Sequence, residues 1–178
     1  MHLTRVDIHT DRNLRKRVKA LYHLSFPKEE RIGWWLLLCN SLRKDIDLFA
    51  WVDGQSFCAM TASVTVEDLH FVLFLAIDPA LRGKGYGSAI LAALQKEYKV
   101  VELNIEPLQE SASNYPERKR RLAFYQKNGF TDTGYHVWEV GGKFRILSTS
   151  EKLDVTRYKK VFKKLTLGIW EVKVKKAE

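Results

Sequence analysis

Hydrophobic and polar residues repeat along this chain with two different periods, which separate its expected strands from its expected helices. The stretch at 71–77 (FVLFLAI) is apolar on both faces, which is typical of a central strand covered by helices on each side. Asp53-Gly54 stands between two expected strands and predicts a tight two-residue hairpin. The expected strands lie at 3–8, 47–52, 57–66, 71–77, 100–105, 133–140, 144–148 and 168–174.

Helical spacing of apolar residues predicts helices at 12–23, 27–42, 87–98, 117–128 and 154–165. Asp11 or Asn13 is the expected N-cap of the first helix, and Pro27 opens the second. Gly129 is expected to end the fourth helix in a left-handed conformation. Antiparallel hairpins come first and strand–helix–strand units follow, so we expect an α+β fold, a mixed α/β domain around one sheet.

Length and composition limit the class of protein. A chain of 178 residues has the size of one domain, and 46% hydrophobic with 29% charged residues excludes global disorder. We therefore expect a single domain over 1–178, with a basic extension from about residue 150. No apolar run approaches the roughly 18 residues of a membrane span, and the N-terminus has no apolar signal segment. Cys39 and Cys58 lack metal-ligand or CxxC spacing, which favours a cytoplasmic protein with reduced thiols and no metal.

The net charge of +9 is concentrated near the C-terminus, where residues 143–178 hold 11 Lys and Arg against 4 Asp and Glu. Such a segment either faces an anionic partner such as nucleic acid or forms a solvated surface. We favour the second alternative, because apolar residues at helical spacing predict a helix with one buried side and lysines on the other. These apolar residues are Val155, Tyr158, Val161, Phe162 and Leu165.

A glycine-rich turn (RGKGYG, 82–87) lies between the apolar strand and the third helix. Its alternating glycines remove the Cβ atoms that would keep an anion away from the backbone N–H groups. The helix N-terminus adds its dipole and Arg82 adds charge, so the turn predicts a phosphate or pyrophosphate site. Walker and dinucleotide patterns fail, because Gly85 follows Lys84 and a GxGxxG fingerprint begun at Gly83 meets Ser88.

The turn matches the pattern R/Q-x-x-G-x-G/A, and a second segment, LAFYQKNGF at 122–130, follows it downstream. In these two motifs and in their order, the chain resembles the GCN5-related N-acetyltransferases (the GNAT superfamily). The resemblance covers residues 3–148, and the stretch after 150 departs from the family pattern. It implies a central twisted, mixed and mostly antiparallel sheet, splayed between its fourth and fifth strands and flanked by helices.

The resemblance also implies acetyl-CoA as the acetyl donor. The pyrophosphate would lie on the amides of the glycine turn, and the pantetheine arm would pair with the end of the apolar strand. Asn114 is an alternative contact, because Arg118 stands where family members often carry an asparagine. The residues expected to bind the donor are Leu75, Ala76, Ile77, Arg82, Gly83, Lys84, Gly85, Tyr86, Gly87, Ser88 and Asn114.

For catalysis, the resemblance implies direct attack of an amine on the thioester, helped by an acid and a base. Tyr125 occupies the family position of the acid that protonates the leaving thiolate. The strand at 71–77 has no carboxylate, so Glu106, just after the expected strand at 100–105, is the better candidate base. Strand alternation would place Glu102 and Asn104 on the same face as Glu106.

The expected function is an N-acetyltransferase that moves an acetyl group from acetyl-CoA to a primary amine of a small molecule or peptide. Two alternatives stay open: a non-catalytic CoA-binding module, and a nucleic-acid-binding module that uses residues 143–176. The sequence names no acceptor amine, and a homodimer is only a family-level expectation.

Overall fold

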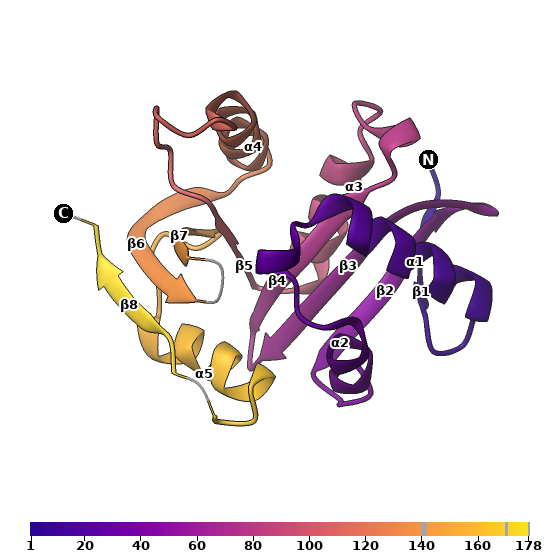
Figure 1. Cartoon of the computed structure of the whole chain (residues 1–178), viewed down its shortest axis with the longest axis horizontal. Coiled ribbons are helices and arrows are strands. Elements are labelled where there is room, and N and C mark those ends of the chain that lie inside the picture. The colour runs from indigo at the N-terminus through magenta and orange to yellow at the C-terminus, as the bar shows by residue number, and fades with distance from the viewer. Residues whose placement is uncertain (140–141, 170, 178) are drawn as a thin grey trace. The chain divides into compact units, whose positions relative to one another are not determined.

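The computed structural model describes residues 1–139, 142–169 and 171–177 (Figure 1). Val140 and Gly141, at a predicted strand end and turn, and Trp170 in the last predicted strand lie outside the described residues. The strands are β1 (Leu3–Asp7), β2 (Ile46–Asp53), β3 (Ser56–Val66), β4 (Leu69–Ile77), β5 (Val100–Ile105), β6 (Thr131–Glu139), β7 (Gly142–Ser148) and β8 (Lys173–Lys176). The helices are α1 (Arg12–Ser25), α2 (Trp34–Asn40), α3 (Tyr86–Glu97), α4 (Tyr115–Lys127) and α5 (Val155–Leu165), with 3-10 segments η1 (Lys28–Glu30) and η2 (Pro79–Leu81).

The strand order is β1-β2-β3-β4-β5-β7-β6-β8. The ladders β1–β2, β2–β3, β5–β7, β6–β7 and β6–β8 are antiparallel, whereas β4 and β5 run parallel. This is the mixed, mostly antiparallel sheet flanked by helices that the sequence predicted, so the expected fold class is confirmed.

The chain forms two compact units, each with its own core. The first unit comprises Met1–Thr65 and Val72–Leu94, and the second comprises Val66–Phe71 and Gln95–Glu178. Strand β4 contributes its first residues to the second unit and the rest to the first.

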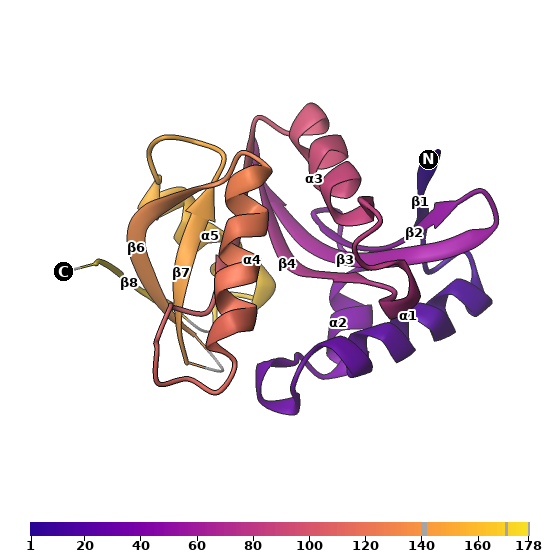
Figure 2. The same ribbon diagram turned by 90° about the horizontal axis from the view of Figure 1, so that it is seen from above.

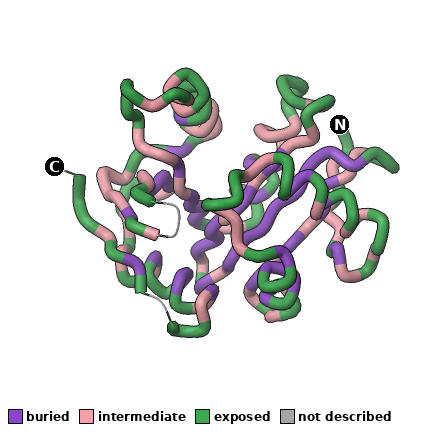
Figure 3. The backbone as a smooth tube through the Cα atoms, in the orientation of Figure 1, coloured by how far each residue is buried: buried purple, intermediate pink, exposed green. Residues whose placement is uncertain are grey.

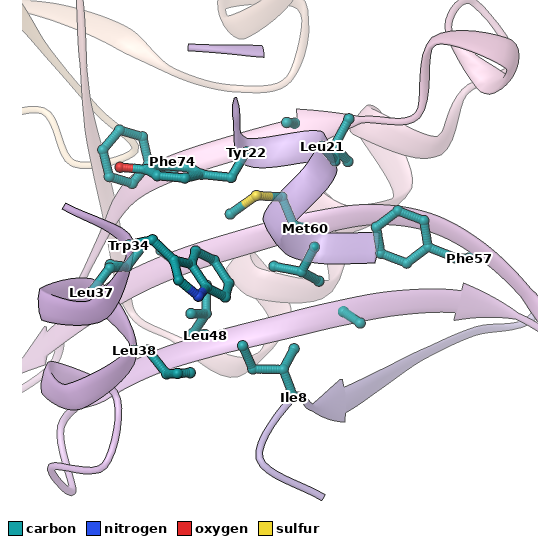
Figure 4. Close-up of a cluster of buried hydrophobic side chains, with 14 residues drawn as sticks. Ile8, Leu21, Tyr22, Trp34, Leu37, Leu38, Leu48, Phe57, Met60 and Phe74 are labelled. Carbon is teal, nitrogen blue, oxygen red and sulfur yellow. The ribbon is translucent and has the colours of Figure 1, made fainter. Parts of the chain in front are cut away.

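In the first unit, α1 and α2 cover one side of the strands and α3 lies on the other side (Figure 2). Burial is concentrated along the strands (Figure 3). Tyr22 of α1 lies at the centre of the core, with its ring 5.0 Å from that of Phe74 and 6.2 Å from that of Trp34 (Figure 4). Phe74 therefore fixes the middle of β4, so that the end of this strand and the glycine turn leave the core at a defined point.

The predicted helix at 27–42 is wrong as a single element, because the chain forms η1 and α2 with an extended segment between them. The phenol of Tyr22 donates a hydrogen bond of 2.9 Å to the carbonyl of Ile32. Gly33 is extended, with φ −51° and ψ 131°, and α2 begins after it. A tertiary hydrogen bond thus takes a carbonyl that a continuous helix would have used.

In the second unit, α4 and α5 lie on opposite sides of the strands β5, β7 and β6 (Figures 1 and 2). Helix α5 buries Tyr158, Val161, Phe162 and Leu165, and the rings of Tyr158 and Phe162 lie edge-on to Phe71 at 5.7 and 5.5 Å. Lys159, Lys160 and Lys163 are exposed. The prediction that this helix docks its apolar side on the domain is confirmed.

The last strand begins at Lys173, later than the predicted start at 168. Leu167 and Gly168 have φ of 56° and 79°, and the N–H of Gly168 donates to the carbonyl of Lys163 at 2.7 Å. This is a left-handed helix ending of the kind glycine favours, so these residues close α5 before β8 can start. Within the described part of the chain, no helix has the length and apolar character to cross a membrane.

Candidate active site

Two hydrogen bonds at Asp78 fix the chain where it passes from β4 to the glycine turn. The N–H of Asp78 donates to the carbonyl of Cys58 at 2.8 Å, and the Asp78 carboxylate accepts from the N–H of Ala80 at 3.0 Å. Asp78 therefore caps η2 and sets the direction in which the chain enters the turn.

Two glycines of the turn have conformations that other residues rarely adopt. Gly83 has φ of +75° and Gly85 has φ of +88°. A Cβ atom built on either residue would meet no atom within 4 Å from the rest of the described chain, its two sequence neighbours apart. The glycines are thus required by the backbone rather than by packing, and the space beside them is open to a ligand.

Helix α3 begins directly after these glycines. Its first backbone bond runs from the N–H of Ala89 to the carbonyl of Gly85 at 3.0 Å. The N–H groups of Tyr86, Gly87 and Ser88 come before that bond, so they have no partner within the helix. Together with the helix dipole and the exposed Arg82 and Lys84, they form a site that suits a phosphate or pyrophosphate.

The side chain of Tyr86 is used to anchor the turn. Its phenol donates to the Asp53 carboxylate at 3.0 Å, and Asp53 also accepts from the N–H of His2 at 2.8 Å. The hydrogen bond to Asp53 is the main cause that raises the pKa of Tyr86 to about 12. Tyr86 can therefore offer a ligand its backbone N–H, while its side chain ties the turn to the β2–β3 hairpin.

The β4 residues that are expected to bind acetyl-CoA differ in their exposure to solvent. Ala76 is buried, whereas Leu75 and Ile77 are partly exposed on the other face of the strand. The guanidinium of Arg82 donates to the carbonyl of Ile77 at 3.4 Å, so this side chain folds back over the strand end.

Tyr125 lies on α4 in the second unit, between two phenylalanine rings. Its ring centre is 5.2 Å from that of Phe124 and 5.6 Å from that of Phe130. Burial is the main cause that raises the pKa of Tyr125 to about 12, with Arg121 opposing the shift and Glu106 adding to it. The phenol therefore keeps its proton at neutral pH, as a proton donor must.

Glu106 forms an ion pair with Arg121 of α4. The carboxylate side chain is 13% exposed and that of Arg121 is 44% exposed, so the pair lies at the edge of the packed region. Arg121 and Glu106 both act on the pKa of Tyr125, so this ion pair lies within electrostatic reach of the neutral phenol.

Residues 45–132 match the sequence profile of the GNAT acetyltransferase domain, a span that contains the glycine turn, Glu106 and Tyr125. The chain carries a GNAT acetyltransferase domain. The Bacillus subtilis (strain 168) protein YjbC, which carries the name of an acetyltransferase, is 29% identical over 110 residues, 62% of this chain and 53% of that protein. The chain thus spans about half the length of this curated relative.

Solved structures share this fold. A GNAT-family acetyltransferase from Bacteroides thetaiotaomicron aligns with a TM-score of 0.72 and 21% identity, over 96% of this chain and 100% of that one. An aminoglycoside 6'-N-acetyltransferase solved with coenzyme A aligns with a TM-score of 0.67 and 15% identity, over 86% and 100%. At these identities the likeness establishes the GNAT fold.

Two residues near the start of α4 are joined by a side-chain hydrogen bond. The guanidinium of Arg118 donates to the Asn114 side chain at 2.8 Å and to the carbonyl of Pro107 at 2.9 Å. These bonds tie the first turns of α4 to the segment that follows β5. Contact of Asn114 with acetyl-CoA stays a prediction. In the structure, the Asn114 and Arg118 side chains position the start of α4.

The predicted common face holds for Glu102 and Asn104 within β5, but it is wrong for Glu106. The amide of Asn104 donates to the phenol of Tyr158 on α5 at 2.8 Å, whereas Glu106 pairs with α4 on the other side. Strand β5 ends at Ile105, so the alternation of side chains does not extend to Glu106.

Glu102 is the notable residue that the prediction left without a role. Its side chain is 1% exposed, and its Oε2 atom has no hydrogen-bond partner among the described residues, while Oε1 accepts from Ser148 at 3.3 Å. Burial is the main cause that raises the pKa of Glu102 to about 7. The sequence signal was a single charged residue inside the strand VVELNI.

The structure divides the predicted site residues between the two units. Leu75, Ala76, Ile77 and the turn at 82–88 belong to the first unit. Tyr125, Glu106 and Asn114 belong to the second, where Glu106 lies within electrostatic reach of Tyr125.

Proposed function

We propose that this GNAT protein transfers an acetyl group from acetyl-CoA to a primary amine. The observation that carries the proposal is the turn in which Gly83 and Gly85 leave open space ahead of the N-terminus of α3. The coenzyme A bound to the aminoglycoside acetyltransferase of the same fold supports acetyl-CoA as the donor. The backbone N–H groups of 86–88 would bind its pyrophosphate, and the end of β4, where Leu75 and Ile77 are partly exposed, would receive the pantetheine arm.

The reaction forms a C–N bond and breaks a C–S bond. The neutral amine attacks the thioester carbonyl carbon, the thiolate leaves and takes one proton, and the new amide nitrogen loses one. A lysine-like amine has a pKa near 10.4, so deprotonation at neutral pH costs roughly 4 kcal/mol. A base is therefore required, and Glu106 is our candidate, directly or through a water molecule.

Tyr125 is our candidate for the proton given to the sulfur. With its raised pKa of about 12 the phenol is protonated at neutral pH, so a proton is present to meet the negative charge that develops on the sulfur as the C–S bond breaks. The proton released by the amine then restores the phenol. The second candidate function is a CoA-binding protein without turnover. The ion pair of Glu106 with Arg121 favours it, because Arg121 already occupies a carboxylate oxygen of the candidate base.

The donor site is tested by Gly85→Val, with Gly134→Val as the matched control. Gly134 also has positive φ, +72°, and open space around its Cβ position, but it lies in β6. Acetyl-CoA at 100 times its Kd should raise the Tm of wild type and of Gly134→Val by about 5–10 °C. Gly85→Val should show no shift, because its side chain occupies the place of the pyrophosphate.

Release of free CoA with a panel of amines, measured on the same proteins, tests turnover. Turnover with at least one amine supports the acetyltransferase, and binding without turnover by any amine of the panel supports the CoA-binding module. Binding by Gly85→Val within threefold of wild type would show that the donor site is elsewhere.

A further inference from the structure

Strands β7, β6 and β8 of the second unit carry two parallel rows of side chains with the same composition. In one row, Trp138 of β6 stands directly between Lys143 of β7 and Lys173 of β8. In the next row, His136 stands between Arg145 and Lys175. Each row is thus an aromatic ring flanked by two basic residues, and we name these six residues the β6–β8 platform.

The platform lies on the face of the sheet that is turned away from α5. Residues opposite each other in a ladder share a face, and successive residues alternate. Val137, between the two rings in sequence, is buried, and Glu139 accepts from Asn104, which also bonds to Tyr158 of α5. The odd-numbered positions of β6 therefore point to α5, and the rings of His136 and Trp138 point to the other side.

The aromatic part of the platform is accessible. Trp138 is 37% exposed, with the Nζ atom of Lys143 at 5.3 Å from its ring centre. The ring of His136 lies 6.4 Å from that of Trp138. Burial and the charge of Lys143 lower the pKa of His136, so its ring is neutral at physiological pH and serves as a surface for stacking.

The charged part of the platform is strongly basic. Three of its four basic residues, Lys143, Lys173 and Lys175, are exposed. The fourth, Arg145, forms an ion pair with Asp132. Neighbouring strands are about 4.8 Å apart and successive rows about 6.7 Å apart, so the cations border the rings on both sides. This pattern matches the chemistry of an unpaired nucleotide chain, whose bases stack on rings while its phosphates meet Lys and Arg.

We propose that the β6–β8 platform binds single-stranded nucleic acid. The inference is independent of acetyl transfer, because none of these six residues is assigned a role in that reaction above. A protein partner fits less well, because the centres of protein interfaces are depleted in charge. Pairing of β8 with a second copy is opposed by the lysines along this edge strand, a device that prevents edge-to-edge association.

The lysines of α5, which also belong to the basic segment 143–178, are not part of the platform. Lys159 and Lys163 lie on a helix that covers the opposite side of the strands, and Lys160 forms an ion pair with Glu67. The register of β8 against β6 is what brings Lys173 and Lys175 beside the rings, and no local pattern in the sequence indicates it.

The experiment measures binding of fluorescein-labelled 12-mers of oligouridylate and oligodeoxythymidylate by the full chain, by anisotropy, at several salt concentrations. Lys173→Gln with Lys175→Gln removes two platform charges, and Lys159→Gln with Lys163→Gln removes the same charge from α5. The platform double variant should bind at least tenfold more weakly at low salt, and the slope of log K against log salt should fall in magnitude by about 1.4. The α5 double variant should bind within twofold of wild type.

Trp138→Leu tests stacking, with circular dichroism to confirm the fold, and should weaken binding about 5-fold to 100-fold with little change in the salt slope. Polyglutamate of similar charge, used as a competitor, should displace the oligonucleotides poorly. Equal losses in both double variants, or displacement by polyglutamate as effective as by unlabelled oligouridylate, would overturn the proposal in favour of unspecific charge attraction. Absence of oligonucleotide binding by the wild type at 50 mM salt would overturn it as well.

Discussion

Tyr125 carries the chemical part of the proposed reaction, and its hydroxyl can be removed without its ring. Tyr125→Phe keeps the contacts with Phe124 and Phe130, so the fold and acetyl-CoA binding should be retained. Loss of a positioned proton donor should lower kcat by about 10²–10⁴-fold. Steady-state kinetics with the best amine of the panel measure this loss.

Tyr115→Phe is the matched control for this variant, because it removes a phenol hydroxyl from the first turn of the same helix. It should leave kcat unchanged. A Tyr125→Phe enzyme that turns over within threefold of wild type would remove the acid assignment from Tyr125.

Glu102 makes the stability of the protein depend on pH. Its pKa is about 7 in the folded chain and 4.5 without the protein environment, because the carboxyl is buried beside Ser148, with Arg157 and Asp154 as the nearest charges. The folded state therefore holds the proton more tightly than the unfolded state. This stabilisation is complete below pH 4.5 and is lost as the pH rises through 7.

Glu102→Gln keeps a neutral side chain of the same shape at every pH. Relative to wild type, the free energy of unfolding of this variant should rise by about 2–3 kcal/mol between pH 5 and pH 8, as urea titrations would measure. Exposed Glu110 supplies the control, since Glu110→Gln should differ from wild type equally at both pH values. A constant difference for Glu102→Gln would mean that its carboxyl titrates normally.

At the scale of elements, α5 is a structural part of the second unit. Phe162 is 4% exposed and packs edge-on to Phe71. Phe162→Ala should lower the free energy of unfolding by about 3–5 kcal/mol, because it removes a buried ring and leaves a cavity. Lys159→Ala, on the exposed side of the same helix, should change it by less than about 0.5 kcal/mol.

Urea unfolding of the two variants measures this contrast. Similar small losses in both would mean that α5 does not contribute to the core. Two polar contacts at the start of α5 also support its structural role. The Asp154 carboxylate caps the helix by accepting from the N–H of Arg157 at 3.0 Å, and the side chain of Arg157 forms an ion pair with Asp68, which precedes β4. The helix is thus held by both its backbone start and its apolar side.

At the scale of the whole molecule, the two compact units carry different parts of the proposed chemistry. The first unit holds the open glycine turn, and the second holds Tyr125, Glu106 and the β6–β8 platform. The excess of positive charge at 143–178 is also divided, because the platform lysines lie on the face of the strands that is turned away from α5. Each property can therefore be removed by a substitution in one unit that leaves the other unit unchanged.

Features that depend on a few neighbouring residues can be predicted from the amino-acid sequence. Gly83 and Gly85 adopt positive φ because the turn needs it, Asp11 caps α1 as one of the two predicted candidates, and Gly129 ends α4 with φ of +84°. The apolar strand and the two family motifs also lie within short segments. Local conformational preference and hydrophobic spacing act over such distances, so these elements and the family were accessible from the sequence.

Relations between residues that are distant in sequence become visible only in the folded chain. The hydrogen bond from Tyr22 to Ile32 divides the predicted second helix, the end of β5 separates Glu106 from Glu102, and burial gives Glu102 its pKa of about 7. The register of β8 against β6 places Lys173 and Lys175 beside Trp138 and His136, across more than 30 residues of chain. Such contacts depend on the packing of the complete chain, which gives a side chain its burial, its partner and its charge environment, and local sequence patterns carry no record of it.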